Sequence, residues 1–358
     1  MVTSNGVNKV AAVVKDNQAT CWMLAFIAAF YGSLWLSGPS GHSTDKAAYE
    51  RARGSFHLSG QEMSQRETRF RQRLLESPRF FKAAGLLFLA VMAAGLAVNV
   101  YCLRRVSRGM PVIPAAGEIW KAPPWGFREV VLVFTFLFFS EAWILILEII
   151  FASLFELKKV DKNLFLMADS LIRDCLAAAL VLWLVARKFR EPFSQIGLCF
   201  RRFLKNVSLG LVGYVAMIPA LVAILYLVSL AAQFFSYEPV PQAVVEIYLK
   251  ESKEKSIIFF TFFVAILGPI IEEIFFRGFT YQAFRKRYGA VGAMLGTAAL
   301  FAAMHMNLTA FVPIFALGVF LAYLYERTGS LVPSMTAHMV HNLIMVFLTL
   351  SFKSLSSS

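Results

Sequence analysis

Two adjacent carboxylates and an arginine stand inside a strongly apolar stretch, GPIIEEIFFRG (268–278). An ionisable side chain in such surroundings is energetically costly, which makes it a candidate for function. Glu273 and Arg277 are four residues apart, so on a helix they share a face and can form an ion pair that offsets this cost. Glu272 is rotated about 100° from that face and has no basic residue at the same spacing. It is therefore available for chemistry.

Further polar side chains follow on two later apolar stretches. FAAMH (301–305) ends in His305, and HMVHN (338–342) contains His338, His341 and Asn342. Three of the five histidines of the chain lie in these two motifs. A single buried histidine is usually a satisfied core residue, but this number, together with the glutamates, favours a functional polar site.

The spacing of the motifs predicts that these side chains meet. Glu272 and His305 each lie about 16 residues from the basic turn RKRYG (285–289), which is roughly 25 Å in an antiparallel helical hairpin. The next turn, ERTGS (326–330), lies on the same side of the membrane, and the HMVHN motif follows it closely enough to reach a similar depth. We therefore expect the motifs to line one cavity.

The side chains in this cavity have the chemistry of amide hydrolysis. A carboxylate in a poorly hydrated site can take a proton from a water molecule at neutral pH. A facing histidine can hold that water, and donors on another helix can stabilise an oxyanion. Together they can hydrolyse a peptide bond without a covalent intermediate.

The composition places these motifs in a membrane. Of the 358 residues, 58% are hydrophobic and 16% are charged, whereas soluble globular proteins have about 45–50% and about 25%. Apolar runs of spanning length must be helical, because the hydrocarbon core offers no other partners to backbone polar groups. The sequence thus predicts an all-α polytopic transmembrane helical bundle with a C-terminal four-helix catalytic core. We expect roughly nine spans, near 21–37, 81–102, 128–154, 165–186, 207–235, 256–276, 289–305, 309–325 and 332–352.

The net charge of +13 comes largely from basic pairs between the apolar runs, such as Arg104-Arg105 and Arg201-Arg202. These pairs indicate loops that meet anionic lipid headgroups, so we expect the lipid bilayer and no nucleic acid as a partner. When the long loop at 38–80 is left out, the count of Lys and Arg favours a cytoplasmic N-terminus. We expect the inner or plasma membrane. The four cysteines are widely separated and form no disulfide framework.

Other charges also fall within expected spans. Glu141 and Glu148 lie in the third, and Asp169, Arg173 and Asp174 lie in the fourth. Asp169 and Arg173 are four residues apart and can pair on one helix face. We expect mainly structural roles for this group.

The three motifs resemble a known family. In order along the chain stand Glu272-Glu273-x-x-x-Arg277, Phe301-x-x-x-His305 and His338-x-x-x-Asn342. This pattern is similar to that of the type II CAAX prenyl endopeptidase and bacteriocin-processing family, also called the CPBP or ABI family of intramembrane proteases.

The resemblance covers about residues 205–352, which would be the protease domain. Residues 1–204 would form an N-terminal transmembrane region with an Arg-rich interfacial loop at 38–80, and 353–358 would be a tail.

The resemblance implies a role for each matched residue. Glu272 would be the general base and His305 its partner, while His338 and Asn342 would form the oxyanion hole. The ion pair of Glu273 and Arg277 would be structural, and no metal or other cofactor would be needed.

His341 lies outside the pattern and has no assigned role. The substrate would be a peptide or a membrane protein: a prenylated CAAX peptide, a bacteriocin or signalling peptide, or another membrane protein. The sequence leaves the oligomeric state open.

Two other functions compete with this interpretation. Glu272, His305 and His338 are suitable zinc ligands, although the HExxH pair of many zinc proteases is absent. A transporter or an immunity-type membrane protein without enzymatic activity is the second alternative, since buried Glu and His residues also serve proton coupling.

Overall fold

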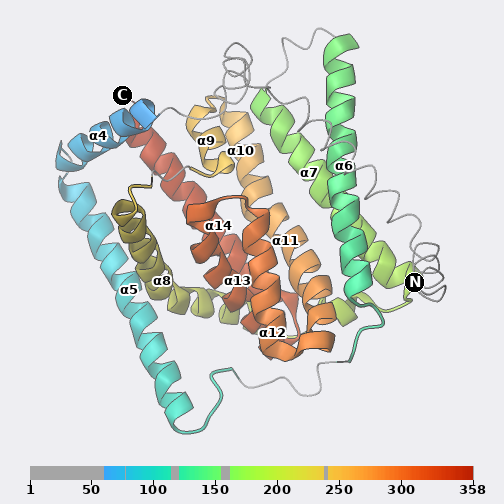
Figure 1. Cartoon of the computed structure of the whole chain (residues 1–358). Helices are drawn as coiled ribbons and strands as arrows, with labels where there is room; N and C mark the ends of the chain where they lie inside the picture. Colours follow the sequence, from blue (N-terminus) through green and yellow to red (C-terminus); the bar gives the residue numbers. More distant parts are fainter. Residues whose placement is uncertain (1–59, 77, 114–120, 155–161, 238–240, 358) are drawn as a thin grey trace, which may run out of the picture. The chain divides into compact units, whose positions relative to one another are not determined.

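The structure is a computed structural model. It describes residues 60–76, 78–113, 121–154, 162–237 and 241–357. All regular secondary structure in these ranges is helical, which confirms the all-α class (Figure 1). In chain order the helices are α4 (Gly60–Glu76), α5 (Pro78–Ser107), α6 (Phe127–Leu154), α7 (Lys162–Trp183), η2 (Leu184–Lys188), η3 (Phe193–Ile196), α8 (Phe203–Phe234), α9 (Ala243–Lys250), α10 (Glu254–Phe262), η4 (Phe263–Leu267), α11 (Gly268–Glu273), η5 (Ile274–Thr280), α12 (Tyr281–Met304), α13 (Leu308–Thr328) and α14 (Leu331–Ser356).

Six helical stretches of the described residues are long and apolar enough to cross a membrane. They are Phe81–Ser107, Phe127–Leu147, Phe203–Phe234, Glu254–Met304, Leu308–Thr328 and Leu331–Ser356. Glu254–Met304 covers two of the expected spans, and the expected first span, 21–37, lies outside the described residues. The expected span at 165–186 largely coincides with α7, whose four charged residues, Lys162, Asp169, Arg173 and Asp174, lower its hydropathy. The chain is an integral membrane protein.

The stretch Glu254–Met304 folds back on itself at Gly289. That residue has a φ of +70°, which interrupts α12 in the left-handed region that glycine tolerates. Phe276 and Phe301 stand at nearly equal distances along the chain from Gly289, and their ring centroids are 5.1 Å apart. The two arms are therefore antiparallel, as the hairpin at RKRYG predicts.

Helices α8, α13 and α14 pack around a shared apolar core. Its buried members are Tyr214, Leu221, Leu317, Leu321, Leu324 and Ala337. Because lipid tails are as apolar as leucine, helix association in a membrane depends on close packing at small residues. Gly210 of α8 is such a residue, since a Cβ there would lie 2.5 Å from the carbonyl oxygen of Pro333 on α14.

The chain divides into two compact units. The described residues of 127–181 belong to the first unit, and those of 60–126 and 182–357 belong to the second. In the first unit, a terminal guanidinium nitrogen of Arg173 lies 3.0 Å from Asp169 and another lies 3.5 Å from Glu141. The pair expected from the spacing of Asp169 and Arg173 is present and is extended to α6. The domain boundary between 204 and 205 stays a prediction.

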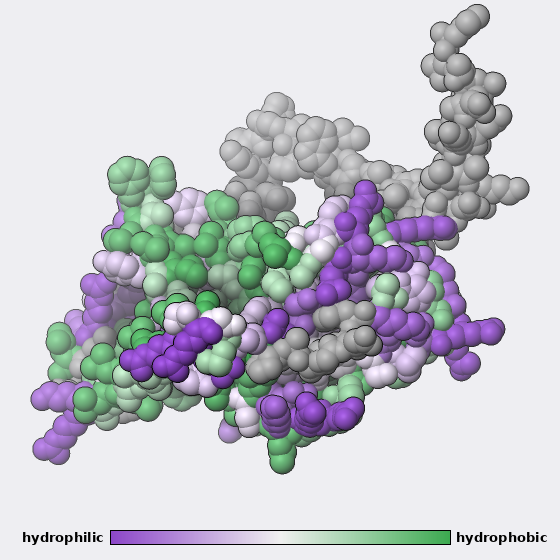
Figure 2. All heavy atoms as spheres, turned by 90° about the horizontal axis from the view of Figure 1, so that it is seen from below, coloured by the Kyte–Doolittle hydropathy of each residue, from purple (hydrophilic) through white to green (hydrophobic). Residues whose placement is uncertain are grey.

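The second unit exposes large apolar side chains along α5. Leu86, Leu87 and Leu89 have 68%, 67% and 62% of their surface accessible. Figure 2 shows broad hydrophobic areas beside groups of hydrophilic side chains on the face seen from below. Such surface is expected where a helix faces lipid. The described part of the loop expected at 38–80 is helical and forms α4 and the start of α5. Residues 38–59 lie outside the described residues.

Candidate functional site

The two glutamates end the short helix α11, which stands between two π-helices, η4 and η5. π-helical turns inside α-helices are rare, and those that occur are often found at functional sites. In η4 the amide of Gly268 donates to the carbonyl oxygen of Phe263, five residues back. In the same register the donor for the carbonyl of Val264 would be residue 269, which is a proline without an N–H. The side-chain amide of Asn342 donates to that carbonyl oxygen instead, at 2.8 Å.

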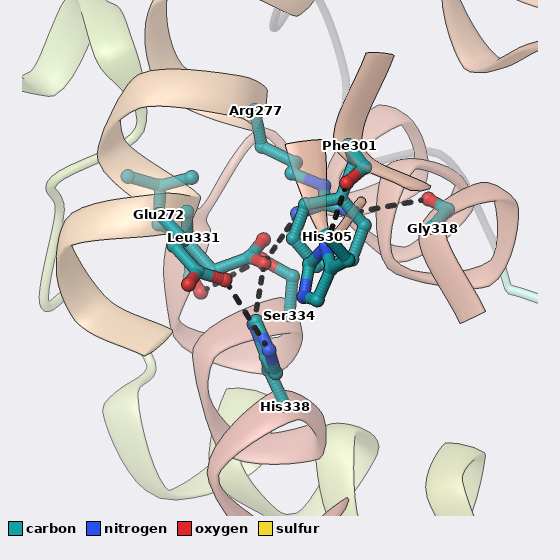
Figure 3. Close-up of polar contacts among 9 residues, drawn as sticks. Glu272, Arg277, Phe301, His305, Gly318, Leu331, Ser334 and His338 are labelled. Atoms are coloured by element: carbon teal, nitrogen blue, oxygen red, sulfur yellow. Dashed lines mark hydrogen bonds and ion pairs between the residues drawn. The ribbon is translucent and has the colours of Figure 1, made fainter. Parts of the chain in front are cut away.

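Glu273 is the centre of a buried polar network. Its side chain is 0% exposed, and its Oε1 accepts from Nη1 of Arg277 at 2.7 Å and from Nδ1 of His338 at 3.0 Å. Nη2 of Arg277 donates to the carbonyl oxygen of Gly318 at 3.3 Å. Its guanidinium carbon lies 4.5 Å from the centroid of the Phe301 ring. Figure 3 shows Arg277 of η5 and His338 of α14 pointing toward the same region, beside Phe301 of α12 and Gly318 of α13.

The imidazole of His338 lies between the two glutamates. A carboxylate accepts hydrogen bonds, so Nδ1 carries a hydrogen toward Glu273, and this leaves Nε2 facing the other side. Nε2 lies 3.6 Å from Oε2 of Glu272. Glu272 is 31% exposed whereas His338 is 3% exposed, so Glu272 lies on the accessible side of the network.

His305 caps the C-terminus of α12 and is fixed by a local contact. Its Nδ1 lies 2.8 Å from the carbonyl oxygen of Phe301, which can only accept, so Nδ1 carries the hydrogen and Nε2 is the acceptor nitrogen. Phe301 lies between the two histidines, with ring centroids 4.9 Å from His305 and 5.6 Å from His338. The direct approach of His305 to Glu272 stays a prediction, because the histidine that lies within ion-pair distance of Glu272 is His338.

The other two polar residues of HMVHN have partners on different helices. One N–H of the Asn342 side-chain amide donates to the carbonyl oxygen of Val264. A side-chain amide nitrogen carries two N–H groups, so the second can donate elsewhere. Nδ1 of His341 lies 3.0 Å from the hydroxyl of Tyr214 on α8. His341 therefore links α14 to α8, a contact that the motif pattern did not assign.

A further residue that the sequence did not reveal supports η5 from outside the matched motifs. Trp125 is fully buried, and its Nε1 donates to the carbonyl oxygen of Phe279 at 3.1 Å. The two rings are stacked with centroids 5.2 Å apart. The proline-rich sequence around Trp125 predicts an irregular loop and gives no sign of this packing.

No group of three or more His, Cys, Asp or Glu side chains in the described ranges is placed to hold a metal ion. Glu272, His305 and His338, the ligands of the zinc alternative, therefore do not form a metal-binding set in this arrangement.

The fold and the site define a class: a membrane-embedded helical protein with a buried Glu–His–Arg network between one arm of a helical hairpin and α14. The family model described as Rce1-like, type II CAAX prenyl endopeptidase, matches residues 254–344. This range contains all three motifs, and the resemblance inferred from them is confirmed. Residues 254–344 are thus similar to the Rce1-like type II CAAX prenyl endopeptidase family. The chain matches no curated protein and no solved structure.

Proposed function

We propose that the chain is a metal-independent intramembrane endopeptidase that hydrolyses a peptide bond near the membrane through an activated water molecule. The observation that carries the proposal is the position of His338 between Glu272 and Glu273. One carboxylate is buried and bound to two donors, while the other is partly exposed. The two adjacent glutamates therefore have different roles.

Glu272 is the general base of this mechanism. A base must reach the water whose proton it takes, and of the two carboxylates Glu272 is the accessible one. The acceptor nitrogen of His305 would orient the same water, since its Nδ1 is already bound to Phe301. The water oxygen attacks the scissile carbonyl carbon, and its proton moves to Glu272. The tetrahedral intermediate then collapses, the scissile C–N bond breaks, and Glu272 passes the proton to the leaving amine.

His338 and Asn342 stabilise the oxyanion that forms in this step. Nε2 of His338 donates only when the ring carries both hydrogens, and the carboxylate of Glu273 at Nδ1 is compatible with that state. The second N–H of the Asn342 amide is the other donor. Arg277 anchors Glu273, so the ion pair acts through His338.

The family match supports a proposal for the substrate class. The name of the matched family points to a prenylated CAAX peptide, and we propose this class ahead of an unmodified peptide or a membrane protein. The exposed apolar surface of the bundle is compatible with a substrate that arrives through the lipid.

Cleavage by the purified protein tests the proposal. A farnesylated CAAX peptide and its unprenylated counterpart are incubated with the wild type and with His305→Gln in lipid nanodiscs. We expect cleavage of the farnesylated peptide, and a loss of about 10²–10⁴ in rate for the variant. Equal rates for wild type and variant would overturn the mechanism. No cleavage of any peptide would favour a transporter or an immunity-type protein.

A further inference from the structure

Helix α4 lies across the C-terminal end of α14 (Figure 1), and a partly open cavity of about 260 Å³ lies between them. Its lining residues are Glu62, Gln65, Arg66 and Arg69 of α4 with Ser356 and Ser357 of the chain end. The ring of Phe70 on α4 contacts that of Phe352 on α14, with centroids 5.3 Å apart. The cavity shares no residue with the site above, and along α14 Ser356 lies roughly 27 Å beyond His338.

The cavity stands at the level of lipid headgroups. The apolar stretch of α14 ends at Ser356, and the apolar stretch of α5 begins at Phe81, directly after α4. Helix α4 itself is rich in arginine and therefore lies at the boundary between hydrocarbon and water. A ligand in the cavity has its polar end in this boundary layer.

The cavity carries donors suited to an anion. Arg66 and Arg69 are three residues apart and share a face of α4. Nη1 of Arg66 is buried, and among the described residues it has no hydrogen-bond partner. A buried guanidinium donor without a partner is destabilising, and a phosphate oxygen satisfies it with a charge-assisted bond.

The charges at the cavity favour an anion. Two arginines and Glu62 together give +1, and Lys353 lies close enough to Arg66 to add to the positive field. The hydroxyls of Ser356 and Ser357 donate to the carbonyl oxygen of Lys353, so the arginines carry the recognition. The volume is below that of most drug-sized pockets, and it therefore suits a headgroup with the acyl chains outside.

We propose that this cavity binds the phosphodiester headgroup of an anionic phospholipid. The bound lipid links α4 to α14, the helix that also carries the HMVHN motif. Basic pockets between membrane helices are a known physical solution for headgroup binding. The occupant is identified by its phosphodiester, its negative charge and its place at the membrane boundary.

Native mass spectrometry of the delipidated full-length protein, titrated with dioleoyl phosphatidylglycerol, tests the proposal. We expect Arg66→Gln with Arg69→Gln to weaken binding of the first lipid by about thirtyfold. The matched control is Arg71→Gln with Arg73→Gln, which removes the same charge from the same helix but from outside the cavity. The control should retain binding within about threefold. Equal losses in both pairs would show general attraction to the helix and would overturn the site.

Two further arms make the test independent of folding and of the phosphate source. Gln65→Trp fills the cavity without a change of charge and should also abolish the first binding event. The melting curve of Gln65→Trp shows whether this variant is folded. If the folded variant still binds the lipid, the proposal is overturned, even when the double arginine variant does not fold. Displacement of the lipid by millimolar inorganic phosphate, or equal affinity for dioleoyl phosphatidylcholine, would overturn the assignment to an anionic phospholipid.

Discussion

The change Glu273→Gln separates the two adjacent glutamates most sharply. In the structure Oε1 of Glu273 accepts from both Arg277 and His338 in a region that excludes water. The amide of glutamine keeps the size of the side chain but removes the negative charge, so the buried Arg277 loses its ion-pair partner and keeps only the weaker electrostatic interaction with Glu272. Glu272→Gln makes the same chemical change on a partly exposed neighbour, so each variant is the matched control of the other.

The expected loss of stability follows from the burial of the pair. Breaking a buried ion pair on one side costs about 3–5 kcal/mol. Arg277 keeps its bond to the carbonyl of Gly318 and its contact with the ring of Phe301, which place the expected loss near the lower end. About 3 kcal/mol corresponds to a fall of about 6–12 °C in melting temperature, on the scale of soluble proteins.

The double change Glu273→Gln with Arg277→Met should recover most of this loss, because no unpaired charge remains. Turnover should stay about tenfold below the wild type. A charge-assisted hydrogen bond to His338 is replaced by a neutral one, and the two differ by about 1–1.5 kcal/mol. Full recovery of turnover in the double variant would show that Glu273 acts only on stability.

Melting curves in detergent and turnover of the same four preparations measure both quantities. The preparations are the wild type, the two single glutamate variants and the double variant. If Glu273→Gln is as stable as the wild type yet inactive, while Glu272→Gln melts early, the roles of the two glutamates are reversed. The argument built on their different burial would then be wrong.

Three other outcomes are expected. Glu272→Gln should melt within about 2 °C of the wild type and lose about 10²–10⁴ in turnover, and normal turnover in this variant would exclude Glu272 as the base. Trp125→Phe keeps the stacked ring but loses the hydrogen bond to Phe279, so the melting temperature should fall by about 2–4 °C, for about 1 kcal/mol; an unchanged melting curve would contradict the stabilising contact. Elemental analysis of active protein should find less than one zinc per chain, and a chelator should leave turnover unchanged. Stoichiometric zinc whose removal abolishes turnover, and whose return restores it, would instead favour the metalloprotease.

Local spacing was sufficient to predict part of the site. The ion pair between Glu273 and Arg277 depends only on their four-residue spacing along one continuous helical stretch, and the structure contains it although η5 begins between them. The hairpin depends on a basic turn between two apolar runs, and the bend is at Gly289, inside that turn. Both are features of short stretches whose geometry the residue types already restrict.

The contact between His338 and Glu273 was not predictable in the same way. Its atoms lie 65 residues apart, and the contact requires both helices to have a particular rotation about their axes. The π-helical segments before and after α11 change that rotation, because five-residue steps place successive side chains differently from an α-helix. A uniform period of 3.6 residues therefore predicts the ion pair of Glu273 with Arg277 but not its hydrogen bond with His338.

The two distant motifs are also joined through the backbone, and this contact explains why Pro269 and Asn342 belong to one site. A proline leaves a carbonyl of the preceding turn without its helical donor, and an unsatisfied carbonyl within a membrane is costly. In η4 this carbonyl belongs to Val264, and the amide of Asn342, 78 residues away, donates to it. The bond fixes the distance between α14 and the start of α11, and thereby the height of His338 relative to the glutamates. The carbonyl oxygen that Pro269 leaves without a helical donor thus accepts a hydrogen bond from Asn342. The second N–H of the same side chain is the one that we assign to the oxyanion.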